Sequence, residues 1–199
     1  MASNPERRAV VTDAALVILG RDGGRALTHR AVDALADIPS GTCANYFPTR
    51  ATLLLAMAKR IFDRLEPAGN RLTELEQVTE EEALASYAGY VVERLTKNPD
   101  MARALIELRL EASRDHEVHD ALAPFLRQGL SDDLEFHQVR GLGANPRVVI
   151  LLHHLVNGIL LDHLTIPLDP HSDPVATAKE AAQHLASGVQ IIPGTRGSY

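Results

Sequence analysis

The sequence is poor in cysteine and in aromatic residues, with one cysteine, no tryptophan, four tyrosines and four phenylalanines among 199 residues. A single cysteine, Cys43, cannot form an intramolecular disulfide or a multi-cysteine zinc site, so we expect a reducing, cytoplasmic compartment. The scarcity of aromatic rings disfavours a flat, aromatic multidrug cavity. Long apolar runs are also missing, because the most apolar stretch, 148–166, contains three histidines, an asparagine and an aspartate. The N-terminus has no apolar signal segment, so we predict neither a leader nor a membrane span.

An overall excess of positive charge is absent as well, since 20 Lys and Arg stand against 26 Asp and Glu, for a net charge of −6. Uniform acidity would disfavour nucleic acid, whose phosphates attract basic proteins. The charge is divided unevenly, however: residues 1–65 hold nine basic and six acidic residues, whereas 66–199 hold eleven and twenty. A mildly basic N-terminal region on an acidic body therefore confines any DNA contact to the first 65 residues.

Apolar residues recur with helical spacing along nearly the whole chain, and no segment alternates apolar and polar residues as a strand would. Asn4-Pro5 and Asn145-Pro146 each combine a cap residue with a proline at the first helical position. We therefore predict an all-α fold of about nine helices, over about 5–22, 28–36, 40–47, 49–66, 79–97, 98–114, 117–140, 145–165 and 173–187. The second of these should turn Val32, Leu35 and Ala36 inward.

The region 28–50 has the layout of a helix-turn-helix, in which one helix is anchored on one side and polar on the other so that it can enter a major groove. At about 100° per residue, Cys43 and Phe47 share one side of the 40–47 helix and form its anchors. Uncharged polar side chains that suit base edges or phosphates share the other side, and a helix start near residue 50 adds free N–H groups for a phosphate. The candidate DNA-binding residues are Thr28, His29, Arg30, Ser40, Gly41, Thr42, Asn45, Tyr46 and Arg50.

Several of these residues stand in a fixed order without gaps: Leu27-Thr28, Val32, Ala36, Ile38-Pro39-Ser40-Gly41-Thr42, Asn45-Tyr46-Phe47-Pro48-Thr49-Arg50 and Leu53-Leu54. The series resembles the DNA-binding domain of TetR-family (tetracycline-repressor-like) regulators over about residues 8–55. Four positions depart from the family pattern. Asp37 replaces a turn glycine, Pro39 replaces a capping serine so that Ser40 is expected to cap, Ala44 replaces a tyrosine that often contacts DNA, and Arg50 replaces a lysine while keeping its charge. The operator sequence therefore cannot be transferred from a better-known relative.

The resemblance implies a three-helix DNA-binding head over 1–50, a helical effector-binding and dimerisation body over 51–193, and a loose tail over 194–199. It also implies a homodimer on a palindromic operator in double-stranded DNA. The residues agree, because the helix from Pro146 is apolar on several faces and needs more cover than one chain of this size offers. A two-fold four-helix interface with the last helix is the simplest cover. The candidate dimerisation residues are Val148, Leu152, Leu155 and Ile159.

A small-molecule effector site should lie inside the body, where a few polar groups stand among apolar ones. The candidate effector-binding residues are Tyr87, Tyr90, Arg109, His153 and Asn157. His153 could equally be a core histidine bonded to a neighbouring helix, and Arg109 could equally form an external salt bridge. We predict a ligand-responsive regulator, most simply a repressor, that its effector releases from DNA.

Metal, cofactor and enzyme signatures fail in this sequence. His116-Glu117-Val118-His119 is one residue short of the zinc-binding H-E-x-x-H spacing, and no Glu-x-x-His pair occurs. Gly141-Leu142-Gly143 lacks the third glycine of a dinucleotide loop, and no nucleophile motif is present. We therefore expect no metal, no cofactor and no enzymatic activity. The alternative that stays open is an all-α small-molecule- or metal-binding protein whose N-terminal helices are only structural.

Overall fold

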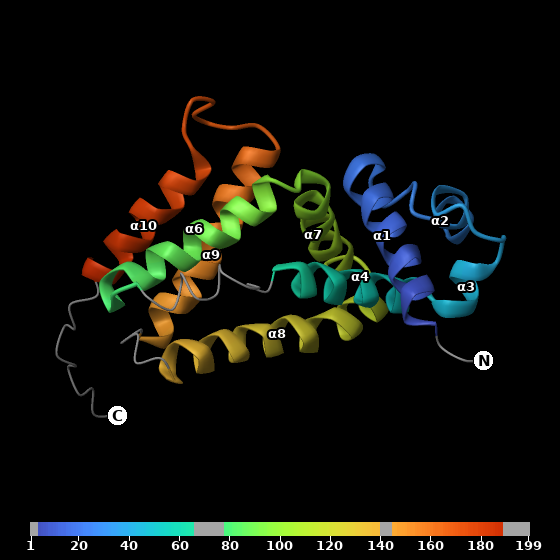
Figure 1. Ribbon diagram of the computed structural model, residues 1–199, viewed down its shortest axis with the longest axis horizontal. Coiled ribbons are helices and arrows are strands. Elements are labelled where there is room, and N and C mark those ends of the chain that lie inside the picture. The colour runs from blue at the N-terminus through green and yellow to red at the C-terminus, as the bar shows by residue number, and fades with distance from the viewer. Residues whose placement is uncertain (1–3, 66–77, 140–144, 189–199) are drawn as a thin grey trace.

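The computed structural model describes residues 4–65, 78–139 and 145–188, and these residues form nine α-helices and no strand (Figure 1). The all-α prediction is confirmed, and most helix bounds agree within a few residues. The predicted tail, 194–199, lies outside the described residues. The helices are α1 (Pro5–Asp22), α2 (His29–Leu35), α3 (Thr42–Tyr46), α4 (Arg50–Leu65), α6 (Glu80–Thr96), α7 (Pro99–Ala112), α8 (His116–Val139), α9 (Pro146–Leu164) and α10 (Pro174–Gly188).

Helix starts follow from side chains that bond to nearby backbone. The Asn4 side chain accepts the Arg7 N–H at 3.1 Å, and the Thr28 hydroxyl accepts the Ala31 N–H, also at 3.1 Å. The first N–H groups of a helix have no partner within it, so these bonds stabilise the predicted start points of α1 and α2.

The turn between α2 and α3 depends on two residues with left-handed backbone. Asp37 has φ 50° and occupies the position where the family pattern has glycine, and Gly41 has φ 88° immediately before α3. Aspartate and glycine tolerate this conformation better than other residues. The second helix therefore ends near the predicted point, and the chain reverses direction into α3.

Two groups of helices lie at opposite ends of the molecule, and α4 and α7 lie between them (Figure 1). Helices α1, α2 and α3 form the head at the N-terminal end, whereas α6, α9 and α10 pack together at the far end of the body. Helix α8 contacts α4 and runs along the molecule towards the start of α9. One core of buried apolar residues extends from α1 through α4 and α7 to α10, so head and body are packed together.

Helix α1 approaches the start of α7 more closely than a side chain would permit. A Cβ placed on Gly20 would lie 2.0 Å from the carbonyl oxygen of Asp100, far inside van der Waals contact. An ion pair from Arg21 Nε to Asp100 Oδ2, 2.6 Å long, crosses the same contact. Head and body are thus held together by close backbone packing as well as by charge.

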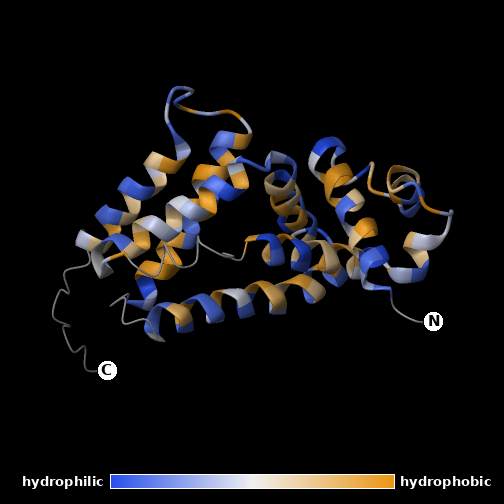
Figure 2. Cartoon of the chain, viewed as in Figure 1, coloured by the Kyte–Doolittle hydropathy of each residue, from blue (hydrophilic) through white to orange (hydrophobic). Residues whose placement is uncertain are grey.

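Apolar and polar patches recur along α8, as expected for a helix with one buried face (Figure 2). Helix α9 differs, because it is long and apolar enough to cross a membrane by length and composition, a test that core helices also pass. Only 28% of its most apolar window is buried inside the chain. Part of the apolar surface of α9 is therefore left uncovered by the residues that the structure describes.

Candidate DNA-binding head and candidate effector site

Helix α3 is divided into a buried side and an accessible side, as the sequence predicts. Cys43 and Phe47 are completely buried, and the Arg8 guanidinium lies 4.4 Å above the Phe47 ring. Asn45 is exposed, while Thr42 and Tyr46 are half-buried. The polar side chains thus remain accessible while the two apolar anchors hold the helix to the head.

The start of α3 is held by a residue that the sequence analysis missed. The Asp33 carboxylate, in α2, accepts the backbone N–H of Gly41 through Oδ2 and that of Cys43 through Oδ1, both at 2.7 Å. The predicted cap, Ser40, is exposed, and the residue in the cap position is Gly41, which makes no side-chain bond. The sequence does contain a signal for Asp33: it is an acidic residue directly after the inward-facing Val32, and a buried carboxylate needs hydrogen-bond donors.

The environment of Cys43 follows from the same arrangement. Burial, and secondly the negative charge of Asp33, raise the pKa of the Cys43 thiol from 9.0 to about 11. A thiol with so high a pKa stays protonated at neutral pH and is a poor nucleophile. Cys43 therefore acts as a small apolar anchor of α3.

The start of α2 presents one accessible cation. Thr28 uses its hydroxyl as the helix cap, and Arg30 is exposed beside it. His29 is half-buried, and its Nε2 is shielded from solvent without a hydrogen-bond partner among the described residues. Leu35, which was predicted to face inward, is 52% exposed, so that part of the prediction is wrong.

Arg50 lies at the first position of α4, and its guanidinium bonds to other parts of the chain while its side chain stays 37% exposed. It pairs with the Glu111 carboxylate of α7 through Nε and through Nη2, the second bond being 2.8 Å long. Its Nη1 donates to the carbonyl of Leu27 at 2.7 Å, and Nη2 also donates to the carbonyl of Gly24 at 2.8 Å. The hydrogen bond to Glu111 raises the pKa of Arg50 above its already high value. The charge of Arg50 is thus already paired within the chain, and its assignment to a phosphate stays a prediction.

In the body, two of the predicted effector residues come close to the same part of α8. The Tyr87 ring makes edge-to-face contacts with Phe136 and His137, with centroids 5.1 and 5.6 Å apart. His153 of α9 bonds through Nε2 to the Asp133 carboxylate at 2.9 Å. These five residues, from three helices, form what we call the α8 cluster.

His137 is the most deeply buried polar side chain of the α8 cluster. It is 7% exposed, and its Nδ1 has no hydrogen-bond partner among the described residues. Burial lowers the pKa of His137, an effect that the charge of Asp133 opposes and that of His153 assists. A neutral imidazole with an unused ring nitrogen can accept or donate one hydrogen bond to a ligand.

The other candidate effector residues are not members of this cluster. Asn157 donates to the backbone carbonyl of His153 at 2.6 Å, one turn back along α9. Tyr90 is buried on α6 with the Arg94 guanidinium 5.7 Å from its ring centre. Arg109 is exposed on α7, so its assignment to an interior site is wrong.

Comparison with known proteins identifies the family. A family profile described as the tetracyclin repressor-like C-terminal domain matches residues 79–188, more than half of the chain. The chain belongs to the TetR family of transcriptional regulators. This family is non-enzymatic, and the resemblance of the N-terminal residues is confirmed by an independent match to the body.

Individual TetR-family proteins resemble the chain to different extents. KstR of Mycolicibacterium smegmatis, an HTH-type transcriptional repressor, is 32% identical over 100 residues, or 50% of this chain and 48% of KstR. The chain spans about half the length of the curated relatives it matches. A putative TetR-family regulator from Rhodococcus sp. shares the fold with a TM-score of 0.71 at 21% identity, covering 94% of this chain and all of the other. The multidrug binding protein EbrR, complexed with ethidium, has a TM-score of 0.68 at 24% identity, covering 92% and 99%.

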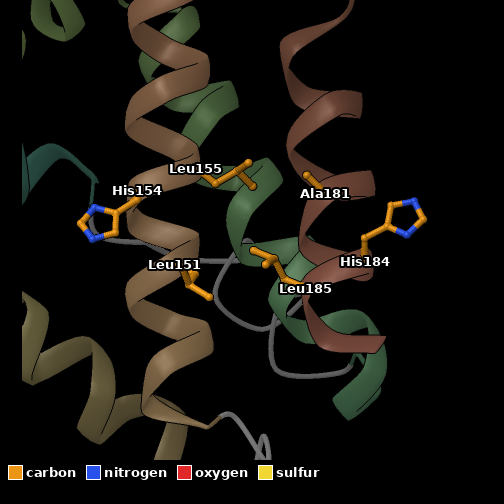
Figure 3. Close-up of a pocket in the computed structure, with 6 residues that line it drawn as sticks. All are labelled: Leu151, His154, Leu155, Ala181, His184 and Leu185. Atoms are coloured by element: carbon orange, nitrogen blue, oxygen red, sulfur yellow. The ribbon is translucent and has the colours of Figure 1, made fainter. Parts of the chain in front are cut away.

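The apolar surface that the body leaves exposed is not the one predicted for dimerisation. Val148 and Leu152 are only 4% and 7% exposed and belong to the chain's own core, so they cannot contact a second copy as predicted. Leu155 and Ile159 are half-buried. Instead, an open apolar groove lies between α9 and α10, lined by Leu151, His154, Leu155, Ala181, His184 and Leu185. The leucines point into this groove, while the two histidines point away on opposite sides (Figure 3).

Proposed function

We propose that this TetR-family chain is a cytoplasmic, homodimeric repressor that binds a palindromic operator through α3 and leaves it when a small molecule binds the body. The observation that carries the proposal is the division of α3, whose apolar side is fully buried while Thr42, Asn45 and Tyr46 remain accessible. A helix anchored in this way can enter a major groove with its polar side towards the bases. The curated relatives, which are named repressors, support repression rather than activation.

The polar side of α3 suggests which residues read bases. Asn45 is exposed, and its amide can bond to both the N6 amino group and N7 of adenine. The Thr42 hydroxyl already donates to the carbonyl of Pro39 at 2.5 Å, so towards DNA it offers only acceptor lone pairs. Thr42 would therefore favour a base-edge amino group on cytosine or adenine.

The remaining candidate contacts suit phosphates. Arg30 is an exposed cation at the start of α2, and Thr28 and His29 precede it. Tyr46 lies on the accessible side of α3, and Ser40 and Gly41 lead into that helix. Such contacts would fix the register of the head on the duplex without selecting a sequence.

A dimer would use the groove between α9 and α10. The two helices leave an apolar surface that includes Leu151 and Leu155, and Leu161 of α9 is exposed as well. A second copy related by a two-fold axis would cover this surface with the same residues, forming a four-helix interface. The two heads would then meet successive major grooves about 34–36 Å apart.

The effector would bind at the α8 cluster. Tyr87 and Phe136 offer ring edges, His137 offers one buried ring nitrogen, and the Asp133–His153 pair borders them. The crystal structure of EbrR with ethidium supports ligand binding by proteins of this fold. An effector that binds more tightly to a conformation with misplaced heads would shift the population away from DNA.

Selection of bound sequences from random duplex DNA at moderate salt tests the proposal. We expect recovery of a palindrome whose half-sites are one helical turn apart. Asn45→Ala should then relax the base preference at one position of each half-site. Arg30→Gln should weaken binding to all sequences and reduce the slope of log K against log salt by about 0.9 for each lost phosphate contact. Recovery of no motif by the wild-type protein would refute the proposed function.

A further inference from the structure

The guanidinium of Arg50 connects three parts of the chain. It donates to Glu111 of α7 with two N–H groups, and to the carbonyls of Gly24 and Leu27 with one each. Gly24 and Leu27 belong to the connection between α1 and α2, and Arg50 itself opens α4 just after α3. This one side chain, which lies just after α3, therefore bonds to the segment before α2 and to α7 of the body.

These contacts leave Arg50 little capacity to bind a phosphate. Four of the five N–H groups of an arginine are occupied here. The positive charge is balanced by the Glu111 carboxylate, whose side chain is 18% exposed. A phosphate at this site would have to displace a two-pronged carboxylate contact, which is among the stronger ion-pair geometries.

We propose that Arg50 is a positioning residue, which holds the α2–α3 unit at a set orientation relative to α7, and that it is not a phosphate contact. This inference rests on the proposed DNA-binding function. The fork of the guanidinium is required, because a lysine ammonium could pair with Glu111 but could not bond to its two oxygens and to both carbonyls in one plane. If the clamp opens, the head samples other orientations, and the apparent Kd rises in inverse proportion to the fraction of heads that remain oriented.

A second ion pair between head and body differs from this clamp and does not replace it. Arg21, in the last turn of α1, contacts Asp100 with an exposed side chain. It bonds to no carbonyl of the α1–α2 connection in the described part of the chain. Exposed pairs of this kind contribute little, on the order of 0–1 kcal/mol. Arg50, unlike Arg21, thus links the connection that leads into α2 to Glu111 of α7.

The test measures Kd as a function of salt for Arg50→Lys and Glu111→Gln on a duplex recovered by the selection described above. Arg50→Lys keeps the positive charge, and Glu111→Gln keeps the shape while it removes the partner charge. If Arg50 is a positioning residue, both variants weaken binding about tenfold, as expected when about a tenth of the heads remain oriented. The salt slope stays at the wild-type value, because no phosphate contact is lost. The double variant is no weaker than the weaker single variant, because the two residues act through one contact.

Two control variants calibrate the measurement. Lys97→Gln removes an exposed positive charge at the end of α6, outside the DNA-binding helices, and should leave Kd and the salt slope unchanged. Arg30→Gln should reduce the slope, as a phosphate contact would. Circular dichroism and thermal melting establish that each variant is folded, and the near-isosteric Glu111→Gln carries the test if Arg50→Lys does not fold.

Two results would overturn the inference. In the first, Arg50→Lys binds less tightly than the wild type whereas Glu111→Gln binds as tightly as the wild type or more tightly. Freeing the guanidinium from its carboxylate would then have strengthened a phosphate contact. Unchanged Kd in both variants would equally show that the clamp does not orient the head. If the wild-type protein selects no DNA sequence, the proposed function fails and this inference fails with it. If the wild type binds and only the variants behave otherwise, the proposed function stands and the inference alone is refuted.

Discussion

Replacement of Asp33 by asparagine tests how α3 is held in the head. The Asp33 carboxylate is 3% exposed and accepts two backbone N–H groups at the start of α3, each at 2.7 Å. Asparagine has nearly the same shape but only one acceptor oxygen, so it can satisfy one of the two N–H groups and turns its own NH₂ towards the other. The variant therefore removes one charge-assisted bond and leaves a donor facing a donor.

The size of the effect follows from these two bonds. A hydrogen bond to a charged group contributes about 1.5–3 kcal/mol, and a buried donor left without a partner costs about 1–3 kcal/mol. Relief from burying the carboxylate offsets part of this loss. We expect the free energy of unfolding to fall by about 2–3 kcal/mol, which for a chain of this size corresponds to a decrease in Tm of roughly 4–12 °C.

Urea unfolding and thermal melting measure the loss, with Asp37→Asn as the matched control. Asp37 undergoes the same chemical change but is exposed, and asparagine tolerates its φ of 50°. The Asp33 variant should also bind selected DNA less tightly, since the start of α3 is no longer held. Equal stability of the two variants would refute the conclusion that Asp33 caps α3.

Four further predictions concern other parts of the molecule. Gly20→Ala should lower the free energy of unfolding in urea by about 1–3 kcal/mol or more, because its Cβ would lie 2.0 Å from the Asp100 carbonyl oxygen; unchanged stability would show that α1 and α7 separate at little cost. Between pH 9 and 11 the wild type should lose stability relative to Cys43→Ala, because burial raises the pKa of the folded thiol to about 11 and the unfolded chain releases its proton first; parallel pH profiles of the two proteins would contradict this. Leu151→Glu should convert the proposed dimer to a monomer in analytical ultracentrifugation, because it places a charge in the apolar groove, and a persistent dimer would mean that the interface lies elsewhere. His137→Phe should abolish the thermal stabilisation that a small-molecule library produces in the wild type, because it removes the ring nitrogen that lacks a partner among the described residues; an unaltered set of stabilising compounds would place the effector away from the α8 cluster.

Predictions that depend on near neighbours in the chain agree with the structure. Asn4, Thr28 and Asn145 accept N–H groups two or three residues further on, at the helix starts that their positions predicted. Cys43 and Phe47 are one helical turn apart, and both are buried. Capping and helical periodicity act over a few residues, so they can be recognised from the order of side chains alone.

Predictions that depend on residues far away in the sequence agree less well with the structure. Arg50 is interpreted as a phosphate ligand because it stands at a predicted helix start and replaces a lysine of the family pattern, whereas its partner Glu111 lies 61 residues further along the chain. Val148 and Leu152 were assigned to a dimer interface because they form an apolar stripe, yet they are covered by the chain's own core. Periodicity shows that a helix face is apolar, but it does not show which neighbour covers that face.

The sequence by itself determined the all-α class, the order of the three head helices, the polar side of α3 and the resemblance to the TetR family. Only the tertiary structure decided that Asp33 caps α3, that Arg50 binds Glu111, and that the described residues leave an apolar groove open between α9 and α10, lined by Leu151 among others. The physical reason is the distance along the chain over which each interaction acts. Helix formation and capping depend on residues within about one turn, whereas ion pairs and packing depend on which helices meet in space.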